Sequence, residues 1–118
     1  NEDGVALLNA DILLLGVAYK PNVSDTRESP ALDIIELLRS RGVNIEYHDP
    51  HVSNIETDSW EYESVPLSVE RLNGCDCAVI ITDHDAIDIE TIVETAPRVF
   101  DSRNATAEFK QFKHVQRL

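Results

Sequence analysis

The chain has 118 residues, which suits one compact domain and leaves no room for a second. Its 22 acidic and 10 basic residues give a formal net charge of −12, so its surface should repel nucleic acid and anionic membranes, which bind clustered Lys and Arg. The longest apolar runs, residues 12–17 and 78–81, are too short to span a bilayer and no signal segment opens the sequence, so a soluble cytoplasmic protein is the default expectation.

The first part of the sequence predicts one central strand. Residues 1–10 are typical of the end of a preceding helix and a linker, so we expect the domain itself to span residues 11–118. From Ile12 to Tyr19 the chain is almost continuously apolar, and Lys20-Pro21-Asn22 ends this run. A strand that is buried on both faces of a parallel sheet has this pattern.

A helix and a second strand are expected next. Ser29-Pro30 offers an N-cap followed by proline at the first helical position. Apolar residues then recur at helical spacing from Ala31, and Gly42 is a stop signal. Residues 43–48 read as a second strand, ended by Asp49-Pro50.

The remainder continues the alternation of strands and helices. We expect a polar, acidic surface loop at 53–64, a short helix at 66–72, a buried strand at 77–82, a helix at 88–95 and a strand at 97–101. The residues after 101 are weakly patterned. Alternating strands and helices imply right-handed crossovers. The predicted fold class is therefore α/β, a Rossmann-like three-layer sandwich with a mainly parallel sheet and helices on both faces.

The two cysteines do not indicate a disulfide or a metal site. Cys75 and Cys77 are separated by one residue, which is poor spacing for a mutual bond, and no further ligands follow in a recognisable pattern. Because Cys77 opens an apolar run, we expect it to be a buried core thiol.

Ligands of open α/β sheets bind outside the carboxyl ends of the strands. Two basic residues are predicted to lie there. Lys20 follows the first predicted strand and Arg103 follows the last one, in an otherwise acidic chain. Together they can neutralise a diphosphate, with Arg binding it in a bidentate manner. The alternative for each residue is an ordinary solvated charge or a salt bridge.

The sequence lacks a self-sufficient NAD site, because no glycine-rich dinucleotide motif follows the first strand. Arg27, in the loop before the first helix, is available to reach a ligand that another domain holds. The alternative for Arg27 is a salt bridge with Asp25 or Glu28.

Two groups of polar residues suggest chemistry but have plainer explanations. Asp83-His84-Asp85 resembles an acid/base cluster, yet no nucleophile lies close in sequence and such residues commonly cap helices. His48 and His51 flank Asp49-Pro50, a turn that needs no metal to explain it. We therefore expect neither catalysis nor metal binding at these positions.

The composition of the charged residues suggests a high-salt environment. Only Lys20, Lys110 and Lys113 are lysines, and acidic residues dominate. Salt screens the self-repulsion of such a surface. We therefore hypothesise a halophilic source.

Residues 16–31 carry an extended motif, in which Tyr19-Lys20 is followed by Asp25-Thr26-Arg27-Glu28-Ser29 at the start of a helix. Further along lie Tyr47-His48-Asp49-Pro50, Thr82-Asp83-His84 and Phe100-Asp101-Ser102-Arg103. In these motifs the chain resembles the C-terminal, nucleotide-sugar-binding domain of the UDP-glucose/GDP-mannose 6-dehydrogenases. The resemblance extends from about Asp11 to Asn104.

This resemblance implies a function and a set of partners. Members of the family oxidise the sugar C6 alcohol to a carboxylate in two NAD-dependent steps, through a thioester on a cysteine. An N-terminal Rossmann domain holds NAD, and a central helical region supplies the cysteine and much of the dimer contact. The resemblance thus implies a UDP-sugar ligand, contacts with those two domains, and a homo-oligomeric full-length enzyme.

The family also implies roles for individual residues. Tyr19 and Lys20 would contact the nucleotide diphosphate, Arg103 would contact the same ligand, and Arg27 would reach across to the NAD cofactor. Neither cysteine lies in the catalytic context of the family, so we expect the isolated domain to be inert. The Asp-Thr-Arg-Glu-Ser-Pro-Ala form of the motif is closer to enzymes of UDP-sugars, including N-acetylmannosamine types, than to GDP-mannose enzymes.

Two other classes of α/β module are alternatives to this family. A response-regulator receiver domain needs an acidic pair after its first strand and a lysine after its last, whereas this chain has Tyr19-Lys20 and Ser102-Arg103 there. A regulatory module that has lost its ligand remains the alternative.

Overall fold

A computed structural model of the chain describes residues 9–103, 105–107 and 113–117. Within these residues, five strands form one parallel sheet in the order β2-β1-β5-β6-β7. They are β1 (Asp11–Leu15), β2 (Asn44–His48), β5 (Cys77–Ile80), β6 (Val99–Asp101) and β7 (Val115–Arg117). The helices are α1 (Pro30–Ser40), α2 (Val69–Gly74) and α3 (Ile89–Thr95), and β3 (Asn54–Glu56) pairs with β4 (Glu61–Glu63).

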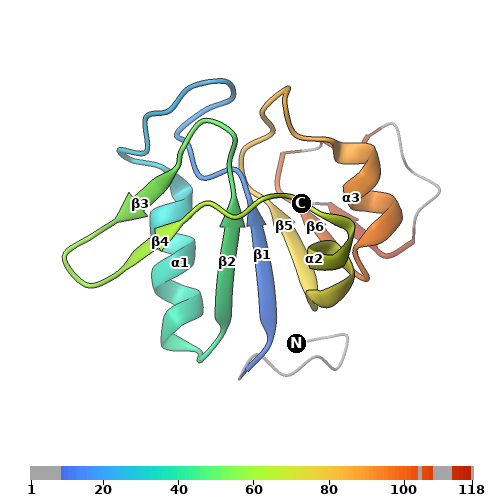
Figure 1. The fold of residues 1–118 in the computed structure, drawn as a ribbon, viewed down its shortest axis with the longest axis horizontal. Helices are drawn as coiled ribbons and strands as arrows, with labels where there is room; N and C mark the ends of the chain where they lie inside the picture. Colours follow the sequence, from blue (N-terminus) through green and yellow to red (C-terminus); the bar gives the residue numbers. More distant parts are fainter. Residues whose placement is uncertain (1–8, 104, 108–112, 118) are drawn as a thin grey trace.

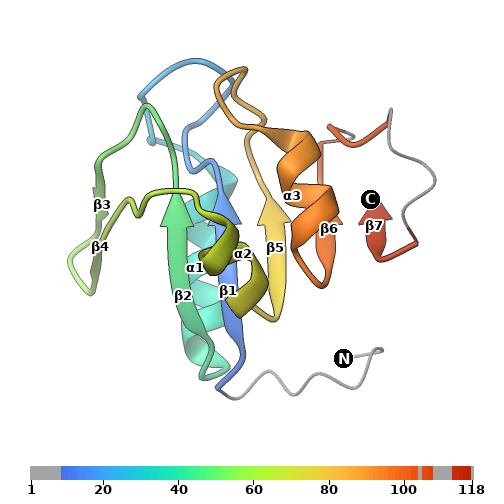
Figure 2. The same ribbon diagram turned by 45° about the vertical axis from the view of Figure 1, so that its right-hand side comes forward.

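The helices lie on both faces of the sheet, as the sequence predicted. α1 covers one face, and α2 and α3 lie on the other (Figures 1 and 2). Successive side chains of β1 serve the two faces in turn: Leu14 packs in one core with Ile35, and Leu15 packs in the other with Leu72 and Ile92. This two-sided burial explains the continuous apolar run and confirms the three-layer α/β class.

The first strand is shorter than predicted. β1 ends at Leu15, although burial continues through Ala18. Gly16 adopts a left-handed conformation with φ of 80°, and the amides of Val17 and Ala18 donate to the carboxylate of Asp49 instead of to a neighbouring strand. An apolar run therefore predicts burial here but not the end of the strand.

The start of α1 agrees with the sequence. Ser29 is the N-cap, and its hydroxyl accepts a hydrogen bond from the amide of Ala31 at 3.1 Å, with Pro30 at the first helical position. Gly42 follows the helix with φ of 76°, a conformation that glycine adopts without strain.

The predicted loop at 53–64 is wrong, because β3 and β4 form an antiparallel hairpin there. Ile55 and Trp60 are buried in the core beneath α1. The indole of Trp60 donates to Glu36, and the guanidinium of Arg39 donates to the hydroxyl of Tyr62 at 2.9 Å. The acidic residues between these apolar side chains obscured the alternating pattern of the strands.

Two further differences concern the last strand and the cysteines. β7 pairs with β6, although the residues after 101 predicted no strand. Cys75 is the buried thiol, whereas Cys77 is only half-buried. The predicted helix end at 1–10 falls largely on residues 1–8, outside the described residues. No helix among the described residues is long and apolar enough to cross a bilayer.

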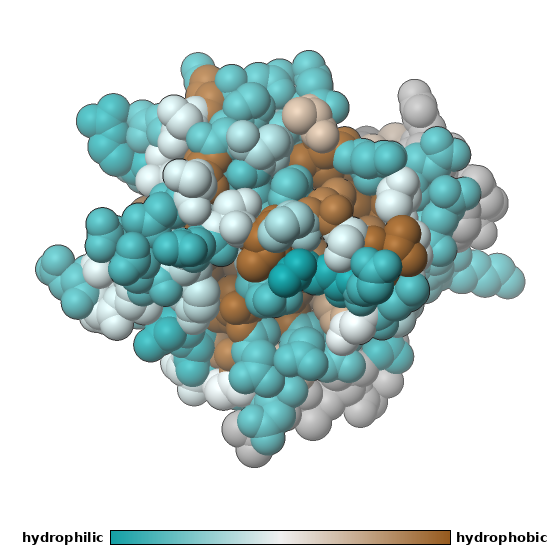
Figure 3. Space-filling model, in the orientation of Figure 1, coloured by the Kyte–Doolittle hydropathy of each residue, from teal (hydrophilic) through white to brown (hydrophobic). Residues whose placement is uncertain are grey.

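The visible surface of the domain is mainly hydrophilic. In the view of Figure 3, hydrophilic residues cover most of the face, and hydrophobic ones show in its middle, over the central strands and near α2 and α3. The largest exposed apolar side chains among the described residues are Tyr19, Leu37 and Val69. Of these, Tyr19 belongs to the residues predicted to bind a ligand.

Candidate functional site

The carboxyl ends of β2, β1, β5 and β6 meet at one edge of the sheet, which we call the carboxyl edge. The chain leaves β1 toward α1 on one face and leaves β5 toward α3 on the other (Figure 2). The neighbouring strands β1 and β5 therefore flank a topological switch point, where α/β sheets bind their ligands. Lys20 follows β1 and Arg103 follows β6, so both predicted cations lie at this edge.

A buried carboxylate at the end of β2 shapes the turn after β1, residues 16–22, which we call the β1 turn. Asp49 is 3% exposed. Its Oδ2 accepts hydrogen bonds from the amides of Val17 at 2.7 Å and Ala18 at 3.2 Å, and its Oδ1 accepts one from the amide of His51 at 2.8 Å. Asp49 therefore fixes the backbone that leads directly into Tyr19 and Lys20.

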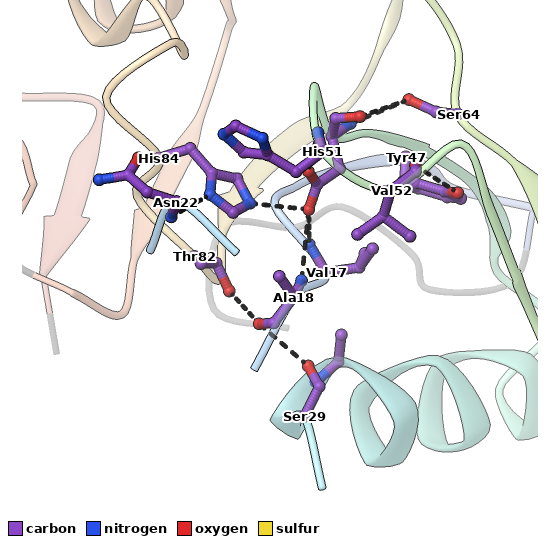
Figure 4. A network of polar contacts seen from close by, with 12 residues as sticks. Val17, Ala18, Asn22, Ser29, Tyr47, His51, Val52, Ser64, Thr82 and His84 are labelled. Carbon is purple, nitrogen blue, oxygen red and sulfur yellow. Dashed lines mark hydrogen bonds and ion pairs between the residues drawn. The ribbon is translucent and has the colours of Figure 1, made fainter. Parts of the chain in front are cut away.

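The imidazole of His84 links this carboxylate to the far end of the β1 turn (Figure 4). Nε2 lies 2.9 Å from Oδ2 of Asp49, and Nδ1 lies 2.7 Å from the amide nitrogen of Asn22. Because an amide N–H only donates, Nδ1 must accept and carries no proton. His84 is therefore the neutral tautomer with its proton on Nε2, which donates to Asp49.

The sequence suggested that Asp83-His84-Asp85 caps a helix, and this is wrong. The N-cap of α3 is Asp88, whose Oδ1 accepts from the amide of Thr91 at 3.2 Å. The segment 82–85, which we call the β5 turn, instead holds the β1 turn. Asn22 and Asp85 bond reciprocally, with the amide of Asp85 donating to Asn22 Oδ1 at 2.9 Å and Asn22 Nδ2 donating to Asp85 Oδ2 at 3.2 Å.

The two turns also touch at their bases. The hydroxyl of Thr82 donates to the carbonyl of Ala18 at 2.7 Å, and the Ser29 hydroxyl donates to the same oxygen at 3.4 Å (Figure 4). A Cβ on Gly16 would lie 2.1 Å from the carbonyl oxygen of Thr82. Since φ at Gly16 is also positive, this crossing of the two turns requires glycine.

A second buried carboxylate builds the loop that carries Arg103. Asp101 is fully buried at the end of β6. It accepts hydrogen bonds from the amides of Arg103, Ala105 and Thr106 and from the Thr106 hydroxyl, at 2.6–3.1 Å. Burial of Asp101 opposes its ionisation, but these bonds outweigh that cost and lower the pKa of the carboxyl. At the ends of both β2 and β6, a buried aspartate carboxylate thus holds the following loop by accepting hydrogen bonds from backbone amides.

The predicted ligand-binding side chains stand at the surface of this framework. Tyr19 is 48% exposed, and exposed Lys20 has no ion-pair partner among the described residues. Arg103 Nε lies 3.9 Å from Oδ1 of Asp83, between two partly exposed side chains. Asn104, where the resemblance to the family ends, lies outside the described residues.

Arg27 makes a different contact. Its Nε and Nη2 donate to the two carboxylate oxygens of Asp25 at 3.1 and 3.0 Å, the salt bridge that the sequence offered as its alternative role. The Arg27 side chain is 88% exposed. The hydrogen bond from Arg27 is the largest cause that lowers the pKa of Asp25 to about 2. A pair this exposed adds little stability and leaves the guanidinium accessible to a ligand.

A hollow of about 490 Å³ lies elsewhere, at the amino ends of β1 and β2 beside α2. Asp11, Glu46 and Glu70 line it, and its Arg71 is already paired with Glu46 at 3.3 Å. Three carboxylates against one paired cation repel a diphosphate. The hollow is therefore a poor nucleotide site, and the carboxyl edge is the better candidate.

Comparison with known proteins shows which α/β family the chain belongs to. The UDP-binding domain of the UDP-glucose/GDP-mannose dehydrogenase family matches residues 13–108, which include both turns and the Arg103 loop. The chain belongs to this family. The match confirms the resemblance seen in the motif around Lys20 and Arg27.

The relatives are UDP-sugar dehydrogenases. The chain is 41% identical over 103 residues to a UDP-N-acetyl-D-mannosamine dehydrogenase of Methanococcus maripaludis, covering 79% of this chain and 22% of that protein. It is 33% identical over 104 residues to the UDP-glucose 6-dehydrogenase TuaD of Bacillus subtilis, with the same two coverages. The chain thus spans about a fifth of the length of these relatives.

A solved structure shares the fold. The UDP-N-acetylmannosamine dehydrogenase of Pyrococcus horikoshii superposes with a TM-score of 0.68 at 29% identity. The superposition covers 87% of this chain and 24% of that one. The fold of this UDP-binding domain family is therefore that of a domain within a larger dehydrogenase.

Proposed function

We propose that the chain binds the nucleotide diphosphate of a UDP-sugar at its carboxyl edge through Tyr19, Lys20 and Arg103. The observation that carries the proposal is the placement of two accessible cations on loops that buried carboxylates hold in shape, in a protein of net charge −12. Lys20 supplies a point charge, and Arg103 supplies a fork of donors that matches phosphate oxygens. Half-exposed Tyr19 adds an aromatic ring and a hydroxyl beside them.

The complete protein is proposed to be an NAD-dependent UDP-sugar 6-dehydrogenase that oxidises the C6 alcohol to a carboxylate. The relatives that share this domain act as UDP-N-acetyl-D-mannosamine or UDP-glucose dehydrogenases by name. NAD is held mainly by another domain, since no glycine-rich dinucleotide motif follows β1. The exposed guanidinium of Arg27 is proposed to reach that cofactor.

The nucleophilic cysteine of the reaction is proposed to lie outside this chain, which leaves the chain inert alone. Cys77 begins β5 and Cys75 precedes it, so both lie at the edge opposite Lys20 and Arg103. Burial also raises the pKa of Cys75 to about 11, which disfavours the thiolate that nucleophilic attack requires.

Removal of each cation tests the proposal. Lys20→Ala and Arg103→Ala should each weaken the binding of UDP to this chain by about tenfold, the loss expected when one charged hydrogen bond is removed. Lys113→Ala is the matched control, because exposed Lys113 lies at the amino end of β7 and should leave affinity unchanged. Equal UDP affinity in Lys20→Ala and in the unmodified chain would contradict the proposal.

The complete enzyme separates the two ligands. Lys20→Ala should mainly raise the KM for the nucleotide-sugar, because it removes binding to a part of the substrate that does not react. Arg27→Ala should instead raise the KM for NAD. A change confined to the sugar nucleotide would remove Arg27 from the cofactor site.

A further inference from the structure

We propose that His84 is a positioning residue for the ligand: its neutral form, protonated on Nε2, holds the β1 turn in the shape that presents Lys20, and protonation of Nδ1 releases that turn. The proposal rests on the function proposed for Lys20. His84 itself is 2% exposed and does not reach the surface where a ligand would lie.

Both ring nitrogens of His84 are committed to different segments. Nε2 donates to Asp49 at the end of β2, and Nδ1 accepts the amide of Asn22, two residues after Lys20. Pro21, whose ring fixes its own φ, lies between Lys20 and Asn22. Because this φ cannot rotate, a displacement of the Asn22 backbone also displaces Lys20.

Protonation of His84 sets two donors against each other. With a proton on Nδ1, two N–H groups would face one another across the 2.7 Å that now separates Nδ1 from the Asn22 nitrogen. The contact between Nδ1 and the Asn22 nitrogen then becomes repulsive, so the Asn22 backbone moves away from the ring. The β1 turn then loses its contact with His84 but keeps its bonds to Asp49 at Val17 and Ala18.

The charged and titratable groups around His84 come from each neighbouring segment. Asp49 ends β2, and His51 stacks edge-on against His84 with ring centroids 4.6 Å apart. Asp85 bonds to Asn22, and Asp83 faces Arg103. Because the His51 imidazole packs directly against that of His84, the test must separate the two rings.

Two substitutions divide the functions of the ring. His84→Asn places an amide oxygen where Nδ1 lies and can still accept the Asn22 amide, while it loses the bond to Asp49. His84→Gln reaches the position of Nε2 and can still donate to Asp49, while the Asn22 amide loses its acceptor. Urea unfolding first establishes that both variants fold. His51→Gln is the control that removes the neighbouring imidazole.

The measurement is the affinity for UDP-glucose between pH 5 and 8, because its diester phosphates do not titrate in this range. We expect the affinity of the unmodified chain and of His51→Gln to fall about tenfold as the pH is lowered. This fall should coincide with protonation of the His84 ring, which the ¹⁵N shifts of that ring report. His84→Asn should bind with near-native affinity at all these pH values, and His84→Gln should bind about tenfold more weakly at pH 8. Affinity that falls equally in His84→Asn would overturn the proposal, as would a proton on Nδ1 at pH 8.

A failure of the proposed function gives a different result. If UDP-glucose does not bind at pH 8, the function proposed for Lys20 is wrong. The amide resonances of Lys20 and Asn22 still decide the role of His84. If the amide resonances of Lys20 and Asn22 shift together with protonation of the His84 ring, the positioning role is supported. If they stay unchanged when the ring is protonated, that role is overturned.

Discussion

Asp49 and His84 form a hydrogen bond with 2.9 Å between Oδ2 and Nε2, and both side chains are fully buried. They come from the ends of two strands, β2 and β5, that lie on either side of β1. The same Oδ2 also accepts the amides of Val17 and Ala18. Three donors converge on one oxygen at the point where the ligand-binding turn leaves the sheet.

Asp49→Asn should destabilise the fold by about 2–4 kcal/mol, because an amide lacks the charge and one of the acceptor sites that these donors need. The free energy of unfolding in urea measures this loss. Asp58→Asn, at an exposed position between β3 and β4, is the control and should stay within about 0.5 kcal/mol of the unmodified chain. Equal stability of the two variants would show that Asp49 does not organise the turn.

Gly16→Ala should cost about 3 kcal/mol or more. The substitution adds a Cβ that would lie 2.1 Å from the Thr82 carbonyl oxygen, at a residue whose φ is 80°. Gly74→Ala is the matched control, since a Cβ there meets nothing within 4 Å and helix propensity favours alanine. Thermal melts of both variants measure the difference, and similar melting temperatures would contradict the close crossing of the two turns.

Asp101→Asn should reduce stability at neutral pH and flatten its dependence on acid. The pKa of Asp101 in the folded chain is lowered from 3.8, so its contribution is complete above that unfolded value and is lost as pH falls through the lower, folded value. We expect a loss of about 2–3 kcal/mol at pH 7, with little loss remaining at the lowest pH values. Urea unfolding from pH 2 to 7 tests this, and an unchanged acid profile would argue against it.

The acidic surface should make stability depend on salt. Because the net charge is −12, the melting temperature should rise with KCl up to molar concentrations. Near the sequence pI of about 4.5 the same salt should have little effect, since the net charge disappears there. A melting temperature at neutral pH that falls or stays flat with KCl would count against the halophilic hypothesis.

The sequence predicted the sheet, its helices and the edge where the cations lie, because hydrophobic periodicity and helix caps are local signals. The Ser29-Pro30 cap and the apolar run from Ile12 are examples. The β3–β4 hairpin was not predicted because its strands are only three residues long and each has a single apolar or aromatic residue between two polar ones. β7 is equally short, and only its pairing with β6 makes it a strand.

The supports of the site could not be predicted because they depend on contacts between distant segments. Asp49 and His84 are 35 residues apart, and Asn22 bonds to an imidazole 62 residues away. In sequence, Asp49-Pro50 reads as a turn and His84 as part of a helix cap. Only the parallel order β2-β1-β5 brings these residues to one edge.

An amide-shift NMR titration of this chain with UDP, GDP and NAD shows whether the nucleotide binds at the carboxyl edge. Each ligand is carried to millimolar concentration, because one domain of a larger site should bind weakly. We predict shifts clustered at residues 19–22 and 102–103, at lower concentrations of UDP than of GDP or NAD. Spectra that stay unchanged with UDP, or shifts confined to the amino-end hollow beside α2, would contradict it.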